Sequence, residues 1–269
     1  MTTETQFEIG IIGAGIMGEA LLVAISKAGI SAVNIVISDK RQERTNELSK
    51  KYGCAVLSAE DIAAQAKNIL LVVKPQDIDA LLESIGKKIA STQRVISFAA
   101  GKKTTLIEKF LSDGVPVLRV MPNTPMSVGV GASAISAGKF ATDADTKAVE
   151  ELLKASGKII VVDEALQDAV TATSGSGPAY FFRFVEAMIA SAQELGLSES
   201  DAKTLVIQTI AGASEMLKQD GASPTKLREN VTSPNGTTFA ALQVFESNDL
   251  ETIIKKAMRV ARDRSQELS

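Results

Sequence analysis

The sequence predicts an α/β protein in two parts, a doubly wound parallel sheet followed by an all-helical region. Two observations lead to this prediction. Short β-branched apolar runs alternate with helical patterns up to residue 162, and no convincing strand pattern follows from Asp163 onward. Strands that alternate with helices at this spacing are typical of a parallel sheet. We therefore expect residues 1–162 to form the sheet domain and residues 163–269 to form the helical domain.

The first predicted strand, residues 9–12, runs directly into a glycine-rich turn and then into an apolar helical pattern from Ile16 to Ala28. This is the GxGxxG pattern in the context that it requires, after a strand and at the start of a helix. Gly13 permits the tight turn, Gly15 lets the backbone approach a pyrophosphate, and Gly18 lets the helix lie close to the strand. The helix start, with its free N–H groups, favours phosphate binding. The alternative is a tight turn without a ligand, but the placement favours a dinucleotide site in a Rossmann-type domain.

The second predicted strand, Val33–Ile37, ends about twenty residues beyond the glycines, where the ribose 2′ position of a dinucleotide is recognised. The polar residues here support two different cofactors. Asp39 could accept a hydrogen bond from a free 2′-hydroxyl, which favours NAD. A 2′-phosphate, which indicates NADP, could instead be held by Ser38, Lys40, Arg41 and Arg44. A solvated, charged helix start is a third interpretation, and it explains Arg44 better than the others.

The alternation continues through the rest of the sheet domain. Further strands are predicted over Ala55–Leu57, Ile69–Val73, Val95–Phe98, Val115–Met121, Gly129–Ser136 and Lys158–Val162, and helices over Ala59–Ala66, Asp77–Ile89, Thr104–Leu111 and Asp143–Ala155. In a parallel sheet of this kind, ligands bind beyond the carboxyl ends of the strands. The loops expected at that edge are Lys74-Pro75-Gln76, Ala99-Ala100-Gly101 and Pro122-Asn123-Thr124-Pro125.

The helical region is predicted to open with a flexible turn, Ser174–Pro178, with Pro178 at the first position of a helix over Ala179–Leu195. That helix is apolar nearly all round, and Arg183 and Glu186 interrupt it at a spacing that lets them pair. Two charges in so short an apolar stretch argue against a membrane span. A helix that is apolar on every face must be buried on every face, so we expect this domain to dimerise. The remaining predicted helices are Glu199–Gln219, Pro224–Asn230, Thr238–Ser247 and Leu250–Glu267.

The amino-acid composition excludes several classes of binding and catalysis. The net charge of −3 argues against a general nucleic-acid or membrane-surface binder. The 269 residues include no histidine, which excludes histidine acid–base catalysis, histidine metal sites and Ser-His or Cys-His nucleophiles. With one cysteine, a structural zinc site is implausible, and we expect no metal. A cofactor must therefore carry most of the chemistry.

The expected location is the cytoplasm. The single cysteine, Cys54, cannot form an internal disulfide, which indicates a reducing compartment. The first residues, MTTETQ, lack the basic region and the apolar core of a signal peptide.

A second candidate site lies between two predicted helices, over residues 230–238, with the sequence NVTSPNGTT. Several hydroxyl groups, a glycine and a helix start coincide here. Backbone N–H groups at a helix start bind a carboxylate readily. The alternative is an ordinary helix cap, since Ser and Thr are among the commonest N-cap residues.

The chain resembles the pyrroline-5-carboxylate reductases, which catalyse the last step of proline synthesis. The resemblance runs from IGAGIMG through VVKPQ, RVMPNTP and DAVTATSGSGPAYFF to NVTSPNGTT and AALQVFE, and SGSGPAY and SPNGTT are its most specific parts. It implies a Rossmann domain followed by a helical dimerisation domain, a homodimer of a kind often assembled into larger rings, and hydride transfer from NAD(P)H to 1-pyrroline-5-carboxylate. The family habit, with Ser38, Lys40 and Arg41, favours NADPH over NADH.

The glycine pattern and the resemblance together define the candidate site residues. Those expected to bind the cofactor are Ile12, Gly13, Ala14, Gly15, Ile16, Met17, Gly18, Asp39, Lys40, Arg41, Val72, Val73, Lys74, Pro75, Phe98, Ala99, Ala100 and Asn230. The resemblance implies substrate contacts from Glu164, Ser233, Gly236, Thr237 and Thr238. The amides of residues 237–238 would hold the substrate carboxylate, Thr238 would hydrogen-bond the ring nitrogen as the catalytic residue, and Glu164 would favour the iminium charge.

The chain departs from the family pattern at two cofactor positions. A family asparagine aligns with Ala59, and the residue after the second strand is the acidic Asp39 rather than a small residue. The chemistry nevertheless suits a chain without histidine. A protonated cyclic imine is already electrophilic, so the protein needs to hold the reactants together and exclude water rather than supply a nucleophile.

Two other functions compete with this one. A β-hydroxyacid dehydrogenase would use a lysine after the Rossmann domain, but no lysine occurs between Lys158 and Lys203. A nucleotide-sensing protein would bind the cofactor tightly without oxidising it in the presence of the cyclic imine.

Overall fold

The computed structural model describes residues 6–267. The chain forms two compact units. One comprises the chain up to Ser176 together with the segment from Ala261 onward, and the other is Gly177–Val260. The last strand of the first unit ends at Val161, so the expected boundary at Asp163 falls in the segment between that strand and Ser176.

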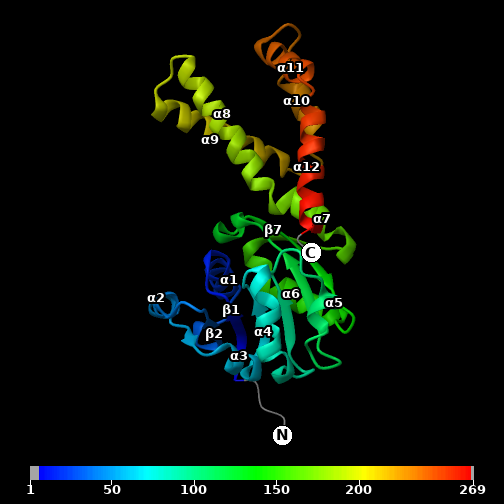
Figure 1. Ribbon diagram of the computed structural model, residues 1–269. Helices are drawn as coiled ribbons and strands as arrows, with labels where there is room; N and C mark the ends of the chain where they lie inside the picture. The colour runs from blue at the N-terminus through cyan, green and yellow to red at the C-terminus, as the bar shows by residue number, and fades with distance from the viewer. Residues whose placement is uncertain (1–5, 268–269) are drawn as a thin grey trace. The chain divides into compact units, whose positions relative to one another are not determined.

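The first unit is built on one eight-stranded sheet (Figure 1). Its strands are β1 (Phe7–Ile12), β2 (Ile35–Ser38), β3 (Ala55–Val56), β4 (Ala66–Leu71), β5 (Arg94–Ser97), β6 (Val117–Met121), β7 (Gly131–Ala137) and β8 (Gly157–Val161). Their order is β3-β2-β1-β4-β5-β6-β7-β8. Strands β1 to β6 are parallel, as predicted.

The prediction of a parallel sheet does not hold for the last two strands. Strand β7 runs antiparallel to β6, and β8 is parallel to β7. The connection over residues 122–130 explains the reversal. It contains only the 3-10 turn Thr124–Val128, whereas a parallel connection needs a crossover of about a dozen residues or more.

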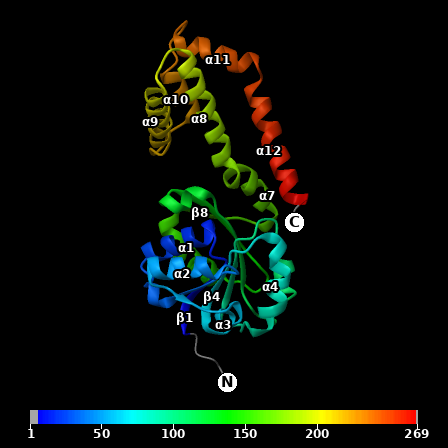
Figure 2. The same ribbon diagram turned by 60° about the vertical axis from the view of Figure 1, so that its left-hand side comes forward.

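Helices cover both faces of the sheet (Figure 2). They are α1 (Ile16–Lys27), α2 (Gln42–Tyr52), α3 (Ala59–Gln65), α4 (Ile78–Ile85), α5 (Thr104–Glu108) and α6 (Asp143–Leu153). One apolar core contains Leu21 of α1, Leu48 of α2 and Val149 of α6. The other contains Ile62 of α3 and Leu82 of α4. The apolar side chains of each helix thus face the sheet, which gives three layers.

The strand register brings the predicted loops to one edge. Ile12 of β1 is paired with Ser38 and with Leu71, Leu71 is paired with Ser97, and Ser97 is paired with Arg119. These residues lie at or near the carboxyl ends of five parallel strands. The loops that follow β1, β2, β4, β5 and β6 therefore share an edge, which confirms the prediction.

The predicted flexible turn at Ser174–Pro178 is wrong, because every residue of this segment except Ser176 is helical. Helix α7 (Gln167–Val170) continues as a π-helical turn, Thr171–Gly175, in which the Ser176 N–H donates to the Thr171 carbonyl oxygen at 2.8 Å. Three hydroxyl groups, of Thr171, Thr173 and Ser174, donate to carbonyl oxygens four residues earlier. These bonds satisfy the hydroxyl groups within the helix despite the Gly-Ser sequence.

The second unit is helical. It contains α8 (Gly177–Glu194), α9 (Glu199–Leu217), α10 (Pro224–Asn230), α11 (Thr237–Ser247) and the first part of α12 (Leu250–Glu267). Its buried apolar side chains are those of Ala202 and Val206 alone, whereas Phe181 and Phe182 are 62% and 61% exposed. Within residues 6–267, none of the helices combines the length and the apolar character needed to cross a bilayer.

Candidate functional site

The turn between β1 and α1 requires glycine at two positions. Gly13 has φ +109°, and a Cβ there would lie 2.6 Å from the backbone of Val72. A Cβ on Gly18 would lie 2.0 Å from the carbonyl oxygen of Gly13. Gly15 differs, because nothing lies within 4 Å of the place where its Cβ would be. Gly13 and Gly18 therefore allow the close packing of strand, turn and helix, and Gly15 leaves open space beside the turn.

That open space belongs to a cavity of about 750 Å³ at the carboxyl edge of the sheet. Of the predicted cofactor residues, the cavity is lined by Ile12, Gly13, Gly15, Asp39, Lys40, Arg41, Val72, Val73 and Lys74. The cavity is also lined by Glu60, Gln76 and Asp77, which are not among the predicted cofactor residues. Glu60 lies in the first turn of α3, where an acidic residue complements the helix dipole and gives no separate sign of a site.

The other predicted cofactor residues of the first unit do not line this cavity. Ala14 is buried in the turn, Gly18 is buried in the first turn of α1, and Pro75 follows Lys74 in a 3-10 turn. Phe98 and Ala99 are buried directly after β5, at the same edge of the sheet. The remaining three are Ile16 and Met17, which open α1, and Ala100, which follows Ala99. Asn230 belongs to the second unit, at the end of α10.

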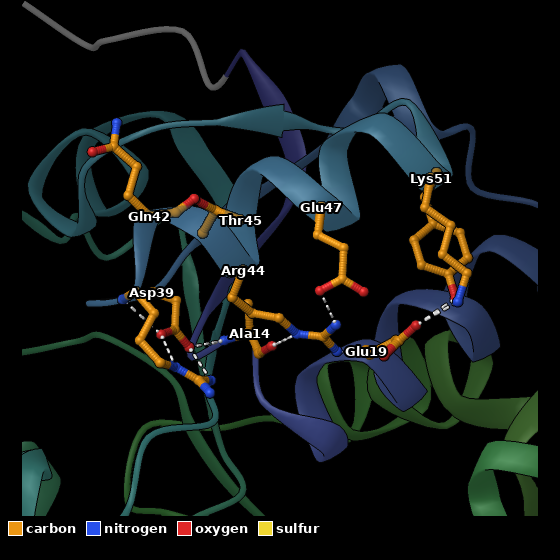
Figure 3. A network of polar contacts seen from close by, with 10 residues as sticks. Ala14, Glu19, Asp39, Gln42, Arg44, Thr45, Glu47 and Lys51 are labelled. Carbon is orange, nitrogen blue, oxygen red and sulfur yellow. Dashed lines mark hydrogen bonds and ion pairs between the residues drawn. The ribbon is translucent and has the colours of Figure 1, made fainter.

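Asp39, just beyond β2, is anchored to the glycine turn (Figure 3). Its Oδ2 accepts the Ala14 N–H at 2.8 Å, and its Oδ1 accepts the Arg41 N–H at 3.0 Å. The Arg41 guanidinium also donates to both carboxylate oxygens, at 3.0 and 3.3 Å. Burial by itself would raise the pKa of Asp39, but the bonds from Arg41 and Ala14 outweigh it and lower that pKa. Asp39 is therefore held as a carboxylate beside the turn.

Arg44 supports the turn from its other side (Figure 3). Its Nε donates to the Ala14 carbonyl oxygen at 3.0 Å, and its guanidinium pairs with Glu19 of α1 and with Glu47. These bonds hold Arg44 against the turn, and its interpretation as a 2′-phosphate ligand stays a prediction. The interpretation of Arg44 as part of a solvated, charged helix start does not fit, because only 19% of its side chain is exposed.

Glu19 also supports the turn, although it is not among the predicted site residues. Its carboxylate accepts bonds from Lys51, Tyr52 and Arg44, which lower its pKa to about 2. An acidic residue just after Gly18, in the first turn of a helix, was the available signal. The partners on α2 could not be known without the fold.

Glu164, a predicted substrate residue, lies between β8 and α7 and binds within the first unit. Its two carboxylate oxygens accept from the N–H and the hydroxyl of Thr104, each at 2.8 Å. The Arg119 guanidinium lies 3.5 Å from Oε1 and is 4% exposed. This carboxylate therefore balances a buried charge and joins the end of β8 to the start of α5.

The loop over residues 230–238 joins α10 to α11. Asn235 has φ 58°, and Gly236 is the N-cap of α11, with no side chain that caps the helix. Thr237 and Thr238 are the first two residues of α11, so the interpretation of these threonines as the N-cap is wrong. A Cβ on Gly236 would lie 2.5 Å from the Ser233 hydroxyl oxygen, so the loop packs closely at this point. The amides of residues 237 and 238 thus open a helix of 11 residues without a side-chain cap.

The residues that line the cavity beside Gly15 fit a dinucleotide. The open position beside Gly15 leaves room for a pyrophosphate at the start of α1, where N–H groups and the helix dipole favour an anion. Asp39 offers an acceptor at the expected ribose position. Within the described part of the chain, no three acidic or cysteine side chains are grouped as a metal ion would require.

Comparison with known proteins connects both units to one family. A family model for pyrroline-5-carboxylate reductase dimerisation matches residues 164–268, and one for NADP oxidoreductase, coenzyme F420-dependent, matches residues 8–101. A pyrroline-5-carboxylate reductase of Corynebacterium melassecola is 38% identical over 97% of this chain and 98% of its own length. The chain belongs to the pyrroline-5-carboxylate reductase family. Its second unit lies within the family's dimerisation domain, and its first unit is an NAD(P)-binding Rossmann domain.

Solved structures of the same family agree. A pyrroline-5-carboxylate reductase from Coxiella burnetii has a TM-score of 0.91 and 34% identity, and the match covers 98% of this chain and 99% of that one. A pyrroline carboxylate reductase from Plasmodium falciparum, solved with NADP bound, has a TM-score of 0.86 and 30% identity over 98% of this chain and 99% of its own. Another relative, from Methanosarcina acetivorans, is 40% identical over 97% of both chains.

Proposed function

We propose that this protein reduces 1-pyrroline-5-carboxylate to L-proline with NAD(P)H, the last step of proline biosynthesis. The observation that carries the proposal is that a chain aligned with pyrroline-5-carboxylate reductases over 97% of its length has the dinucleotide cavity beside Gly15. The absence of histidine from the sequence is compatible with this chemistry, because a protonated imine needs no protein nucleophile.

The chain's residues bind and orient the reactants in this proposal. The bound NAD(P)H supplies the hydride. The turn over residues 12–18 holds the pyrophosphate, and Asn230 is a further cofactor contact. Thr237 and Thr238 present their amides to the substrate carboxylate, and the Thr238 hydroxyl bonds the ring nitrogen. Ser233 and Gly236 shape that loop, and Glu164 favours the positive charge of the iminium.

The assembly that we propose is a homodimer formed through α8, with dimers joined into larger rings. Its support is the apolar surface of the second unit, where Phe181, Phe182 and Phe184 are all exposed on one helix. We place the enzyme in the cytoplasm, because its single cysteine, Cys54, is free and cannot form an internal disulfide.

A spectrophotometric assay tests the reaction. Purified protein is mixed with pyrroline-5-carboxylate and either NADH or NADPH, and the absorbance of the reduced nicotinamide is followed. We expect oxidation of the nicotinamide that depends on the imine and yields proline. Tight binding of a reduced dinucleotide, with no oxidation on addition of the imine, would instead support a nucleotide-sensing protein.

A further inference from the structure

A second cavity lies at the edge of the sheet opposite to the dinucleotide cavity. It has a volume of about 260 Å³, and its lining includes Asn68 of β4 and Arg94 of β5. Ile9 of β1 is paired with Asn68, and Asn68 is paired with Arg94, so these residues lie near the amino ends of three parallel strands. The two cavities share no lining residue. A ligand in the second cavity would therefore occupy a separate site.

The guanidinium of Arg94 is held in the wall of this second cavity. Its Nε donates to the Asp145 carboxylate, and its Nη1 lies 3.4 Å from the side-chain oxygen of Asn68. Asp145 also accepts the N–H and the hydroxyl of Thr142, and the Asn68 Nδ2 donates to the Glu8 carbonyl oxygen at 3.0 Å. The Arg94 side chain is 21% exposed, and no group within residues 6–267 binds its Nη2. A guanidinium that is fixed in place and keeps free donors is suited to a carboxylate.

Acidic residues line the same cavity. They are Glu8 and Glu151, beside the basic residues Lys67, Arg94 and Lys154. The Lys154 ammonium donates to one carboxylate oxygen of Glu151 at 2.7 Å and leaves the other oxygen available. Glu8 forms no ion pair within the described part of the chain. Lining residues of both signs disfavour an anion of high charge and suit a ligand that has one positive and one negative group.

The other lining residues are small or apolar. Ala28 and Ile30 follow α1, and Ala148 and Leu152 belong to α6. Leu152 is part of the apolar core on that face of the sheet, and Ile30 packs against it. An aliphatic group in the cavity would contact these side chains and leave water. The lining thus matches a small molecule with a carboxylate, an ammonium and a short aliphatic group.

We propose that this cavity binds a free α-amino acid with a small aliphatic side chain. The carboxylate of the ligand binds Nη2 of Arg94, and its ammonium binds the carboxylate of Glu151. The aliphatic side chain packs against Ile30 and Leu152. The proposal does not depend on the reaction proposed above, because the dinucleotide cavity lies at the other edge of the sheet.

The first test is calorimetric titration of the full chain with L-valine, which is neither substrate nor product of the proposed reaction. We expect saturable binding of one L-valine per chain. The methyl ester and the N-acetyl derivative of L-valine should each bind at least about tenfold more weakly, because each lacks one of the two charges. No saturable binding of L-valine up to about 10 mM overturns the proposal, and equal affinity for the three compounds does so as well.

Ala148→Leu shows whether the bound L-valine lies in this cavity. Ala148 lines the cavity on α6, and a leucine there fills space without removing any charged group. We expect affinity for L-valine to fall at least about tenfold. Ala144→Leu is the matched control, because it makes the same change one turn earlier on α6, at an exposed position outside the lining. Unchanged affinity in Ala148→Leu means that L-valine binds elsewhere, and the proposal is then wrong.

Arg94→Lys tests the carboxylate contact. Lysine keeps a positive charge opposite Asp145 but lacks the planar set of donors. Affinity for L-valine should fall about tenfold, and circular dichroism shows whether the variant is folded. A folded Arg94→Lys variant that binds L-valine as tightly as the unmodified protein overturns the assignment of Arg94. If this variant does not fold, the comparison of Ala148→Leu with Ala144→Leu and the two valine derivatives decide the proposal.

Discussion

The Nε of Arg44 lies 3.0 Å from the carbonyl oxygen of Ala14, and the Ala14 N–H is bound at 2.8 Å by Asp39. Both polar groups of one turn residue are therefore held by side chains. The conformation of the turn depends on the start of α2 and the end of β2 as well as on its glycines.

Arg44→Met should weaken NADH and NADPH by similar factors, about three- to tenfold, because the lost bond supports the turn and touches no phosphate. Fluorescence titration with each reduced cofactor measures this. Lys154→Met is the control, since Lys154 pairs with Glu151 and does not line the cofactor cavity. A loss confined to NADPH would mean that Arg44 contacts the 2′-phosphate after all.

Glu19→Gln should make the protein less stable at neutral pH by about 1–2 kcal/mol, with the effect fading in acid. Bonds from Lys51, Tyr52 and Arg44 lower the folded-state pKa of Glu19 from 4.5 to about 2. The contribution is complete above pH 4.5 and is lost as the pH falls toward 2. Urea unfolding of both proteins across this range measures it. Glu151→Gln is the control, because it removes only an exposed ion pair and should change the stability by less than about 1 kcal/mol.

Phe182→Glu should disrupt the dimer, because it would bury a charge without a partner in the interface. Phe184→Glu should act in the same way. We expect aggregated or monomeric, poorly folded material by light scattering, in contrast to a dimer for the unmodified protein. The control is Val33→Glu, which places the same charge at a 71% exposed apolar position of the first unit. A monodisperse, fully active monomer of the unmodified chain would refute the dimer.

Thr238→Ala should lower turnover about ten- to a hundredfold, which corresponds to a lost hydrogen bond to a charged group. Thr238→Ser should keep most of the activity. Since Gly236 rather than Thr238 caps α11, the melting temperature should hardly change. Thr209→Ala is the control, because that hydroxyl bonds only to the Leu205 carbonyl oxygen of its own helix. Normal turnover with a lowered melting temperature would show that Thr238 has a structural role alone.

Glu164→Gln should destabilise the protein by about 3 kcal/mol, because the buried guanidinium of Arg119 would lose its counter-charge. Combining Arg119→Met with Glu164→Gln should restore part of that loss, since no charge then remains unpaired. Urea unfolding of the single and double variants gives the coupling energy. If the two losses simply add, the pair is not an interacting unit.

Local patterns predicted much of the fold. The β-branched runs around Ile11 and Leu70 mark strands, and Gly13 and Gly18 mark a turn whose close contacts exclude any side chain. These features depend on neighbours in sequence and on continuous apolar runs that are buried on both faces of the sheet. Sequence reasoning could therefore find them.

The features that it missed depend on contacts between distant residues. The direction of β7 depends on the length of its connection to β6, and the π-helical turn at Thr171–Gly175 depends on hydroxyl bonds that overrule a Gly-Ser turn signal. The role of Arg44 required knowing that α2 lies beside the glycine turn. The sequence does not show which groups a charged side chain binds in the folded protein.

The Ser265 hydroxyl donates to the Asp168 carboxylate at 2.7 Å, across 97 positions of sequence. The segment from Ala261 onward belongs to the first compact unit, although all of the second unit precedes it in the chain. A ribosome builds the chain from the N-terminus, so it finishes α8 to α11 before it makes this segment. The sheet domain is begun first and completed last, and a nascent chain paused within α9 or α10 would still lack part of the domain that it started.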